Sequence, residues 1–511
     1  MPLEREGEIE PAPGGRRIAR GFRRGIGYSG DEMPASRLPV PGDPGRKSRE
    51  ALLQRALRGA GDVGPPPAAV PLRSRGVLGG LSRNGMRSKQ HPVLFALLFL
   101  LLGFGIAIGL AMARNPPAAR LRLAHRFLVS DPTFLSSALD GAALTSGNRI
   151  DVLRNGREIF PEMLASIASA KKTIDFEAYI FWSGSVVTRF RDALGERARQ
   201  GVEVRILLDA VGTRRKIHPE DIDELRRAGC HVEFFHPARV GMLWAINHRT
   251  HRRILVVDGR IGFTGGVGFA DEWEGDADSP KHWRETQARL EGPVVRSLQA
   301  AFDQNWCETT GEPLLGNGFF PPLPPAGTAT AAVVASSFMA AESASRRLYA
   351  VALSSATRRI WLCNSYFLPD EDAAALLVAA EARGVDVQVI VPGDKVTDVP
   401  ATKAAGRGSY GPLLRGGVRI FEYQGTMFHP KTMVVDGLFA TIGSANVDDR
   451  SFHLNEEVNV AVADGEVARR MEGIFEEDRR RCRPYTYEDW KRRTLWKRVT
   501  EWLSRPFRAE L

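Results

Sequence analysis

One pattern occurs twice in this chain of 511 residues, and it constrains the fold more than any other feature. The first copy, HRRILVVDGRIGFTGG, begins at His251, and the second, HPKTMVVDGLFATIGSAN, begins at His429. Each copy has a histidine, a cation two residues later, an apolar run, an aspartate and a Gly-rich turn. Short apolar runs between turn signals are typical of buried strands. The doubling therefore predicts two similar units, each with a buried strand beside a histidine.

Alternation along a strand places the histidine and the cation of each copy on the same face. His251 then lies beside Arg253, and His429 lies beside Lys431. A titratable imidazole next to a fixed positive charge suits a doubly negative or pentavalent phosphoryl group. These four residues are therefore the first candidates for catalysis.

The segments before the two motifs also correspond. A run that closes a helix and opens an apolar strand occurs as RQGVEV from Arg199 and as ARGVDV from Ala382. The glycine in each run, Gly201 or Gly384, suits the end of a helix. Helices that alternate with apolar strands predict an α/β architecture with a mixed or largely parallel sheet.

Composition gives the expected boundaries. Residues 311–327 are rich in Pro and Gly and predict a linker, so we expect one domain over 126–310 and a second over 328–490. Four well-separated cysteines form no CxxC pair and imply no zinc site. The balance of 70 Lys and Arg against 60 Asp and Glu gives a net charge of +10, which favours anionic partners.

An N-terminal membrane segment is predicted by a stretch without charge from Pro92 to Ala113. As a helix it would be about 33 Å long, enough to cross a bilayer core of about 30 Å. We expect a transmembrane anchor over 92–113, preceded by a disordered basic leader over 1–91. A true start at Met86 is the alternative to that leader. Basic residues on the two flanks nearly balance, so the orientation stays open.

The C-terminus, residues 491–511, is predicted to be a basic amphipathic helix. One helical face collects its apolar residues, which are Leu495, Trp496, Val499, Trp502 and Leu503. Tryptophan on the apolar face of a basic helix favours a membrane interface, and packing on the second domain is the alternative.

The second motif continues into a longer signature, GSAN from Gly443 and DDRSFHLNEE from Asp448. Together with the paired motifs, this signature resembles the phospholipase D superfamily and, within it, the bacterial cardiolipin synthases. The resemblance runs from about Arg126 to the C-terminus. It implies two duplicated phospholipase D-type α/β sandwich domains, packed together after the membrane helix so that the two histidines meet across their interface.

The resemblance also implies a mechanism. His251 would attack phosphorus and form a phosphohistidine, while His429 would protonate the leaving alkoxide and then deprotonate the incoming alcohol. The sequence alone does not decide which histidine is the nucleophile. Arg253 and Lys431 would neutralise the equatorial oxygens, so no metal and no cofactor are expected.

The first copy departs from the family pattern at two positions. Arg253 stands where the family has lysine, and Gly268 stands where it has asparagine. Arginine keeps the charge and forks onto phosphate oxygens, but its position can differ from that of lysine. Gly268 removes one polar contact to phosphate or histidine.

Other site residues follow from the same resemblance. We expect Gly266, Ser444 and Asn446 to bind the substrate phosphate or to position a histidine. The segment Trp283–Thr286 resembles a family motif and is interpreted as scaffold near the site.

Four acids complete the expected site. Asp258 and Asp436 belong to the catalytic motifs and are expected to orient them rather than to touch substrate. Glu272 and Glu457, which follow the two motifs, are expected to bond the imidazole nitrogens that are not used in chemistry.

The resemblance implies a phosphatidyltransferase that makes cardiolipin from phosphatidylglycerol or another phospholipid donor. Its expected place is the inner membrane of a bacterial cell, with a single-pass anchor and anionic phospholipids as substrates. A phospholipase D-type hydrolase, acting on lipid or, as a less favoured substrate, on nucleic acid, is one alternative. A non-catalytic lipid-binding homologue with a decayed first motif is another. The sequence leaves the acceptor lipid and the oligomeric state open.

Overall fold

The computed structural model of the chain describes residues 141–237, 247–337, 343–394 and 396–504, with a few single positions between Phe99 and Leu139. The predicted leader lies outside the described residues, and so does the predicted anchor apart from Phe99, Gly103 and Gly105. Among the residues that are described, no helix combines the length and the apolar character needed to cross a membrane.

The first half of the described chain alternates strands with helices. Its elements are β1 (Thr145–Arg154), α4 (Asn155–Ser169), β2 (Thr173–Ala178), α5 (Ser185–Arg199), β3 (Glu203–Asp209), α6 (Pro219–Arg227), β4 (His231–Phe235), β5 (Ile254–Val257), β6 (Ile261–Gly265), the 3-10 helix η2 (Asp271–Trp273), β7 (Thr286–Glu291) and α7 (Val295–Thr310).

The second half follows nearly the same order and ends with three additional elements. It contains β8 (Ala329–Ser336), α8 (Ala344–Ser355), β9 (Arg359–Asn364), α9 (Glu371–Ala382), β10 (Asp386–Pro392), α10 (Pro400–Arg415), β11 (Arg419–Tyr423), β12 (Lys431–Val435), β13 (Phe439–Gly443), α11 (Asp449–His453), β14 (Glu457–Ala463) and α12 (Gly465–Arg480), followed by β15 (Cys482–Tyr485), α13 (Tyr487–Lys491) and α14 (Leu495–Ser504).

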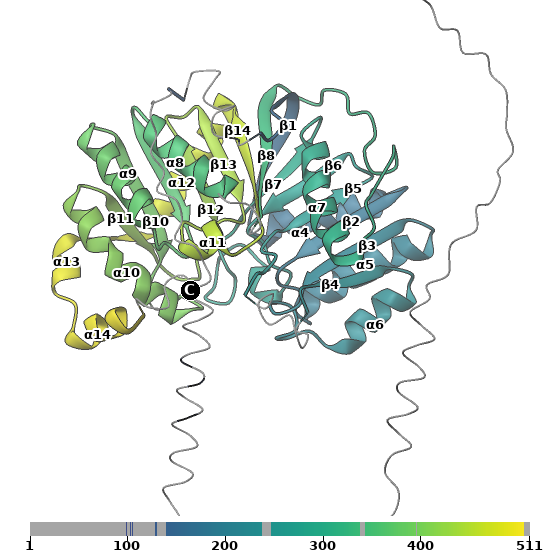
Figure 1. Cartoon of the computed structure of the whole chain (residues 1–511), viewed down its shortest axis with the longest axis horizontal. Coiled ribbons are helices and arrows are strands. Elements are labelled where there is room, and N and C mark those ends of the chain that lie inside the picture. Colours follow the sequence, from purple (N-terminus) through teal and green to yellow (C-terminus); the bar gives the residue numbers. More distant parts are fainter. Residues whose placement is uncertain are drawn as a thin grey trace, which may run out of the picture. The chain divides into compact units, whose positions relative to one another are not determined.

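All strands described above join one mixed sheet, as Figure 1 shows. Its order is β15-β11-β10-β9-β12-β13-β14-β8-β1-β7-β6-β5-β2-β3-β4. The halves meet where β1 pairs antiparallel with β8. Read inward from β4 and from β11, the two sides of the sheet have the same strand order, so the motif strands β5 and β12 take equivalent positions. The prediction of an α/β fold with a mixed sheet is confirmed.

Local sequence explains why these strands and helices form. The strands β3 and β10 pair in parallel on both edges and read as nearly continuous apolar runs, as expected for strands covered on both faces. The helices before them end where Gly201 and Gly384 both adopt a φ of 87°. Only glycine takes this left-handed conformation without strain, so both predicted helix ends are correct.

The three larger of four apolar cores among the described residues hold the sheet between layers of helices. One core lies under α4, α5 and α6 in the first half, and another lies under α8, α9 and α10 in the second. The third is shared, because α7 packs on β8 of the second half and α12 packs on β1 of the first half. This shared core joins the two halves directly and fixes the positions of the two motif strands.

Between α7 and β8 the described chain has neither helix nor strand, and the predicted linker 311–327 falls in this stretch. At the C-terminus the predicted helix over 491–511 is wrong in its start. Helix α13 ends at Lys491, and a separate helix, α14, begins only at Leu495. Residues 505–511 lie outside the described part.

Candidate active site

Both histidines lie just before a buried strand. Arg253 immediately precedes β5, Lys431 is the first residue of β12, and each histidine comes two residues before its cation. The two histidines line one pocket, and only 7% of His251 and 3% of His429 are exposed. The fold therefore brings the two motifs together at one site.

Each histidine segment is held by a segment of the other half. The backbone N–H of His251 donates to the carbonyl of Glu456 at 2.9 Å, and that of His429 donates to the carbonyl of Arg284 at 2.9 Å. Glu456 precedes β14 and Arg284 precedes β7, so the two contacts are equivalent. Because each contact crosses from one half to the other, neither half forms a complete site by itself.

Two buried carboxylates bind the histidines across the same junction. Glu457 Oε1 lies 2.9 Å from His251 Nδ1, and Glu285 Oε2 lies 2.6 Å from His429 Nδ1. A carboxylate at this position holds the imidazole proton on Nδ1. The Nε2 atom of each ring is then left with its lone pair.

The assignment of Glu272 as an imidazole partner is wrong. Glu272 lies in η2 at the surface and pairs with Lys216 at 3.0 Å. Glu285 takes the expected role, and it lies within the segment Trp283–Thr286 that the sequence predicts to be scaffold. The sequence carried one usable signal, because Glu285 precedes β7 and Glu457 opens β14, which are equivalent strands. Glu457 does bond an imidazole, but it is the imidazole of the first motif.

The two motif cations also contact the histidine rings, Arg253 at Nε2 of His251 and Lys431 at both Nε2 and Nδ1 of His429. Arg253 Nη2 lies 2.9 Å from His251 Nε2, and another N–H of the same guanidinium donates to the backbone carbonyl of His251. Lys431 Nζ lies 3.0 Å from His429 Nε2 and donates to Ser365 Oγ at 2.7 Å. Arg253, which stands where the family has lysine, therefore contacts its histidine in the first half as Lys431 does in the second.

Burial and neighbouring charge set the protonation of this cluster. Burial, reinforced by the charge of Arg253, lowers the pKa of His251 to about 4. Burial, together with the charges of Lys431 and Arg253, holds the pKa of His429 well below its usual value. Both imidazoles are therefore neutral near pH 7 until an anion offsets the two cations.

The Gly-rich turns after the motifs differ in how they support the carboxylates. In the second half, Ser444 Oγ donates to Glu457. In the first half the equivalent residue is Gly266, where a Cβ would lie 2.6 Å from Glu285 Oε1. Gly266 leaves room for Glu285, and its backbone forms a hydrogen bond with His429, so it helps to position that histidine.

The asparagine of the second turn faces the pocket. Asn446 lines the cavity, and its buried Oδ1 has no hydrogen-bond partner among the described residues. In the first half the equivalent position is Gly268, and a Cβ there would lie 2.8 Å from the ring of Trp273. Trp273 also donates from Nε1 to Glu285 Oε2 at 3.1 Å. Trp273, which the sequence does not single out, thus gives Glu285 the donor that Ser444 gives Glu457 in the other half.

The motif aspartates lie at the far ends of their strands, away from the pocket. Asp258 accepts hydrogen bonds from the backbone N–H groups of Lys171, Lys172 and Thr173. Asp436 binds the equivalent loop through the N–H groups of three residues, which are Thr357, Arg358 and Arg359. Neither carboxylate lines the cavity, so each acts by fixing the strand that carries its motif.

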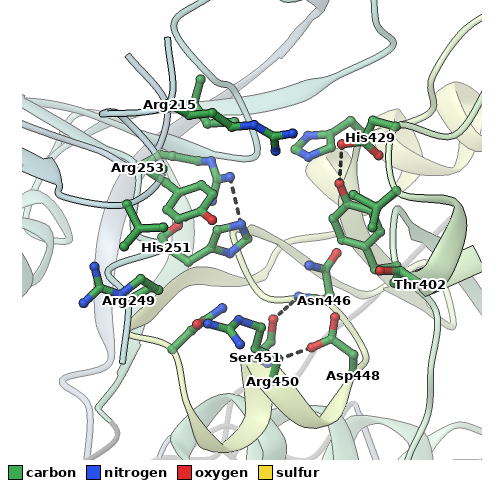
Figure 2. A pocket seen from close by; sticks show the side chains of 18 of the residues that line it. Arg215, Arg249, His251, Arg253, Thr402, His429, Asn446, Asp448, Arg450 and Ser451 are labelled. Carbon is green, nitrogen blue, oxygen red and sulfur yellow. Dashed lines mark hydrogen bonds between the residues drawn. The ribbon is translucent and has the colours of Figure 1, made fainter. Parts of the chain in front are cut away.

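The pocket has a volume of about 410 Å³ and takes its walls from both halves. Figure 2 shows His251 and His429 on two sides of this space. The first half contributes Tyr179, Ile180, Trp182, Val211, Gly212, Arg215, Arg249, His251, Arg253, Trp273 and Trp283, and the second half contributes Tyr366, Asp398, Val399, Thr402, His429, Asn446, Asp448, Arg450, Ser451 and Asn455. Aromatic rings beside cations suit a ligand with both apolar and anionic parts.

Tyr179 and Tyr366, one from each half, both line this cavity. The ring of Tyr179 lies 5.1 Å from that of His251, and the hydroxyl of Tyr366 donates to Asp398 at 2.7 Å.

Another cluster of potential ligands lies outside the pocket. Asp370, Asp449 and His453 offer ligand atoms within 4.8 Å of one another. The guanidinium of Arg346 pairs with Asp370 at 2.9 Å, so a cation already occupies this acidic position. The cluster has no direct part in the chemistry of the two histidines.

The match to a known protein family falls into the same two halves. The family model described as cardiolipin synthase, PLD-like domain, matches residues 163–306 and 349–479. The chain is 36% identical over 413 residues to a cardiolipin synthase of Geobacillus kaustophilus, which covers 80% of this chain and 79% of that one. It is 34% identical over 367 residues to the major cardiolipin synthase of Bacillus subtilis, covering 71% of this chain and 76% of the other.

A solved structure, the phosphatidylserine synthase of Haemophilus influenzae, matches with a TM-score of 0.58. The match covers 74% of this chain and 100% of that one at 12% sequence identity. At this identity the likeness concerns the fold alone.

Proposed function

This chain belongs to the cardiolipin synthase family of phospholipase D-like proteins, and from that membership we propose that it is a membrane-bound phosphatidyltransferase. It transfers the phosphatidyl group of phosphatidylglycerol, or of another phospholipid donor, to the free hydroxyl of a second phosphatidylglycerol and so makes cardiolipin. The observation that carries the proposal is the pair of histidines in one pocket, each with its own carboxylate and its own cation.

In the first step, His251 is the nucleophile. Glu457 holds the proton on Nδ1, so the Nε2 lone pair attacks phosphorus and forms a phosphohistidine. The bond between phosphorus and the oxygen of the headgroup breaks, and His429 gives a proton to that leaving oxygen. A neutral alcohol departs, and Arg253 and Lys431 stabilise the charge on the remaining phosphoryl oxygens.

In the second step, the hydroxyl of the acceptor gives its proton to His429. Its oxygen attacks phosphorus, the bond to Nε2 breaks, and the lone pair returns to His251. His429 ends in the protonated state from which it began the first step, so the cycle closes without a metal or another cofactor.

The lowered pKa values fit this cycle once a substrate is bound. Burial, with the adjacent cations as the second cause, lowers the pKa of both histidines. A phosphodiester anion between Arg253 and Lys431 would offset their charges and raise the pKa of His429, so that it binds the proton it must donate. Protonation of the acid is therefore coupled to the arrival of the phosphate.

We also propose that the two halves, 126–310 and 328–490, are duplicated phospholipase D-type domains joined by the linker 311–327. The matching strand orders on the two sides of the sheet support this. The two matched regions of the family model support it independently, because one falls in each half.

Attachment to the bacterial inner membrane is proposed through two elements. One is the single-pass anchor over 92–113, which rests on its uncharged sequence. The other is α14. Its apolar residues are exposed, with 73% of Trp496 and 65% of Trp502 accessible, while Glu501 on its other face is buried and pairs with Arg493.

The helix α14 packs on α10, and the N-terminal residues of α10 reach the pocket. Val399 and Thr402 at this end line the cavity. A bilayer that covers the apolar face of α14 would therefore bring lipid headgroups close to the active site.

The test is the lipid profile of a bacterium that lacks its own cardiolipin synthases. Cells that express the chain should accumulate cardiolipin, and cells that express His429→Ala at equal membrane abundance should not. Purified enzyme on phosphatidylglycerol vesicles separates transfer from hydrolysis. Phosphatidic acid without cardiolipin in both experiments would replace the proposal with a phospholipase D-type hydrolase.

A further inference from the structure

The transferred phosphoryl group has two cations to match its charge. Arg253 and Lys431 are both buried, and both contact a reacting histidine. A phosphodiester carries one negative charge, and its pentavalent transition state carries two. Two cations at the floor of the pocket therefore suffice for the reacting group.

Of the other cations that line the pocket, Arg249 pairs with Asp209 and Arg450 donates to Asn247, whereas Arg215 enters from the exposed turn between β3 and α6. Figure 2 shows its guanidinium pointing into the cavity toward His429. No carboxylate and no hydrogen-bond acceptor in the described part of the chain pairs with it. The charges that dominate the lowered pKa of His429 after burial are those of Lys431 and Arg253. Arg215 is thus an unpaired charge at the exposed entrance of the pocket, whereas Arg253 and Lys431 lie at its buried end.

The two neighbours of Arg215 in sequence serve as a comparison, because both are engaged on the outer surface. The guanidinium of Arg214 lies 5.4 Å from the ring centre of Phe234. Lys216 Nζ pairs with Glu272 at 3.0 Å and lies over the ring of Trp182. Among these three consecutive cations, only Arg215 lines the cavity.

We infer that Arg215 binds the phosphodiester of the acceptor lipid, so that the pocket prefers an acceptor alcohol that carries its own phosphate. This inference rests on the proposed function and specifies its acceptor. A guanidinium group binds two phosphate oxygens at once. An aliphatic alcohol or water has no such pair of oxygens to offer. A rim cation that holds the acceptor phosphate would keep the acceptor hydroxyl near the phosphohistidine in competition with water.

The experiment compares Arg215→Gln with Arg214→Gln in the purified full chain. Arg214→Gln is the matched control, since it removes the adjacent positive charge outside the pocket. Both variants and the wild type receive phosphatidylglycerol vesicles with and without ethanol. Three products are followed, which are cardiolipin, phosphatidylethanol and phosphatidic acid. Donor and transferred phosphoryl group are the same in all three reactions, and only the acceptor differs.

Loss of a charge-assisted contact should lower cardiolipin formation by Arg215→Gln roughly tenfold, while phosphatidylethanol and phosphatidic acid form at wild-type rates. Arg214→Gln should match the wild type in all three products. An equal fall of all three products in Arg215→Gln would overturn the inference, because Arg215 would then act on the transferred group. Identical product ratios in the two variants would overturn it as well. Absence of cardiolipin from the wild type would instead refute the proposed function.

Discussion

The ring of Trp273 occupies the space that a side chain at position 268 would need. A Cβ on Gly268 would lie 2.8 Å from the indole, and the Nε1 group of the same indole donates to Glu285 at 3.1 Å. In the other half, the hydroxyl of Ser444 donates to Glu457. The two half-sites therefore reach the same result, a carboxylate held against a histidine, with different donors. The glycine at 268 is a packing partner of Trp273 and not a sign of a decayed motif.

Restoring asparagine at that position should consequently harm the protein. Gly268→Asn would force Trp273 from its place, and overpacking of this kind costs about 1–3 kcal/mol of stability. We expect a lower midpoint of urea unfolding together with a loss of transferase activity. Gly318→Asn is the matched control, since nothing lies within 4 Å of a Cβ at Gly318. A Gly268→Asn enzyme as stable and as active as the wild type would contradict this account.

Trp273→Phe isolates the hydrogen bond from the packing. The indole donor lowers the pKa of Glu285, which burial otherwise raises, so its removal should favour the protonated acid. A protonated Glu285 no longer holds His429, and we expect kcat/KM to fall on the order of tenfold, with the acid limb of its pH profile moved to higher pH. Trp283→Phe is the matched control, because it removes the same atoms from another indole that lies against His429. Equal pH profiles for the two variants would show that the donor has no such role.

The arginine of the first motif gives a second prediction on pH. With a pKa of about 4, His251 stays neutral until the pH falls to that value, so its protonation should add a fall in kcat/KM near pH 4, below the fall caused by protonation of Glu285, whose pKa burial raises. Burial is the larger cause and Arg253 the next. In Arg253→Gln the pKa of His251 should rise toward, but not reach, 6.5, and the acid limb should move up with it.

Arg253→Lys is the control for this prediction, because it keeps the charge and restores the residue of the family pattern. Its acid limb should stay with that of the wild type. The position of the limb is the readout, since the removal of charge also lowers the maximum rate. If the acid limb of Arg253→Gln stays at the wild-type pH, a group other than His251 titrates there.

The sequence predicted the parts of the site that depend on local spacing. The contact between His251 and Arg253 follows from their two-residue spacing in the segment before β5, and Gly201 and Gly384 end helices because of their own conformational freedom. The partner of each histidine could not be derived in this way. Glu285 reaches His429 only because Arg284, just before β7, bridges to Phe428 of the opposite half, and that register depends on the whole sheet. Glu272 is nearer to the first motif in sequence than Glu285 is, but η2 places it at the surface.

Trp273 was missed for the same reason. Its importance depends on the absence of a side chain at Gly268, five residues earlier, and on Glu285 beyond it. A tryptophan in a polar loop is compatible with many packing roles when seen alone. For α14, the helical pattern was visible, but membrane contact and packing on the second domain were treated as alternatives. The helix in fact packs through Glu501 and leaves its apolar face exposed.

That exposed face supports the last prediction. Trp496 and Trp502 lie on it without contributing to the core, so Trp496→Ser combined with Trp502→Ser should leave the unfolding midpoint unchanged. If the face contacts lipid, burial of the two rings should contribute about 1.5–3 kcal/mol each to membrane contact. The full-length double variant should then show a KM for phosphatidylglycerol vesicles at least tenfold higher, while its kcat and its activity on monomeric short-chain phosphatidylglycerol stay the same. Leu315→Ser is the control, because Leu315 is 75% exposed but lies in the linker between the halves. A double variant that keeps the wild-type KM on vesicles would remove α14 from the membrane contact and leave attachment to the N-terminal segment.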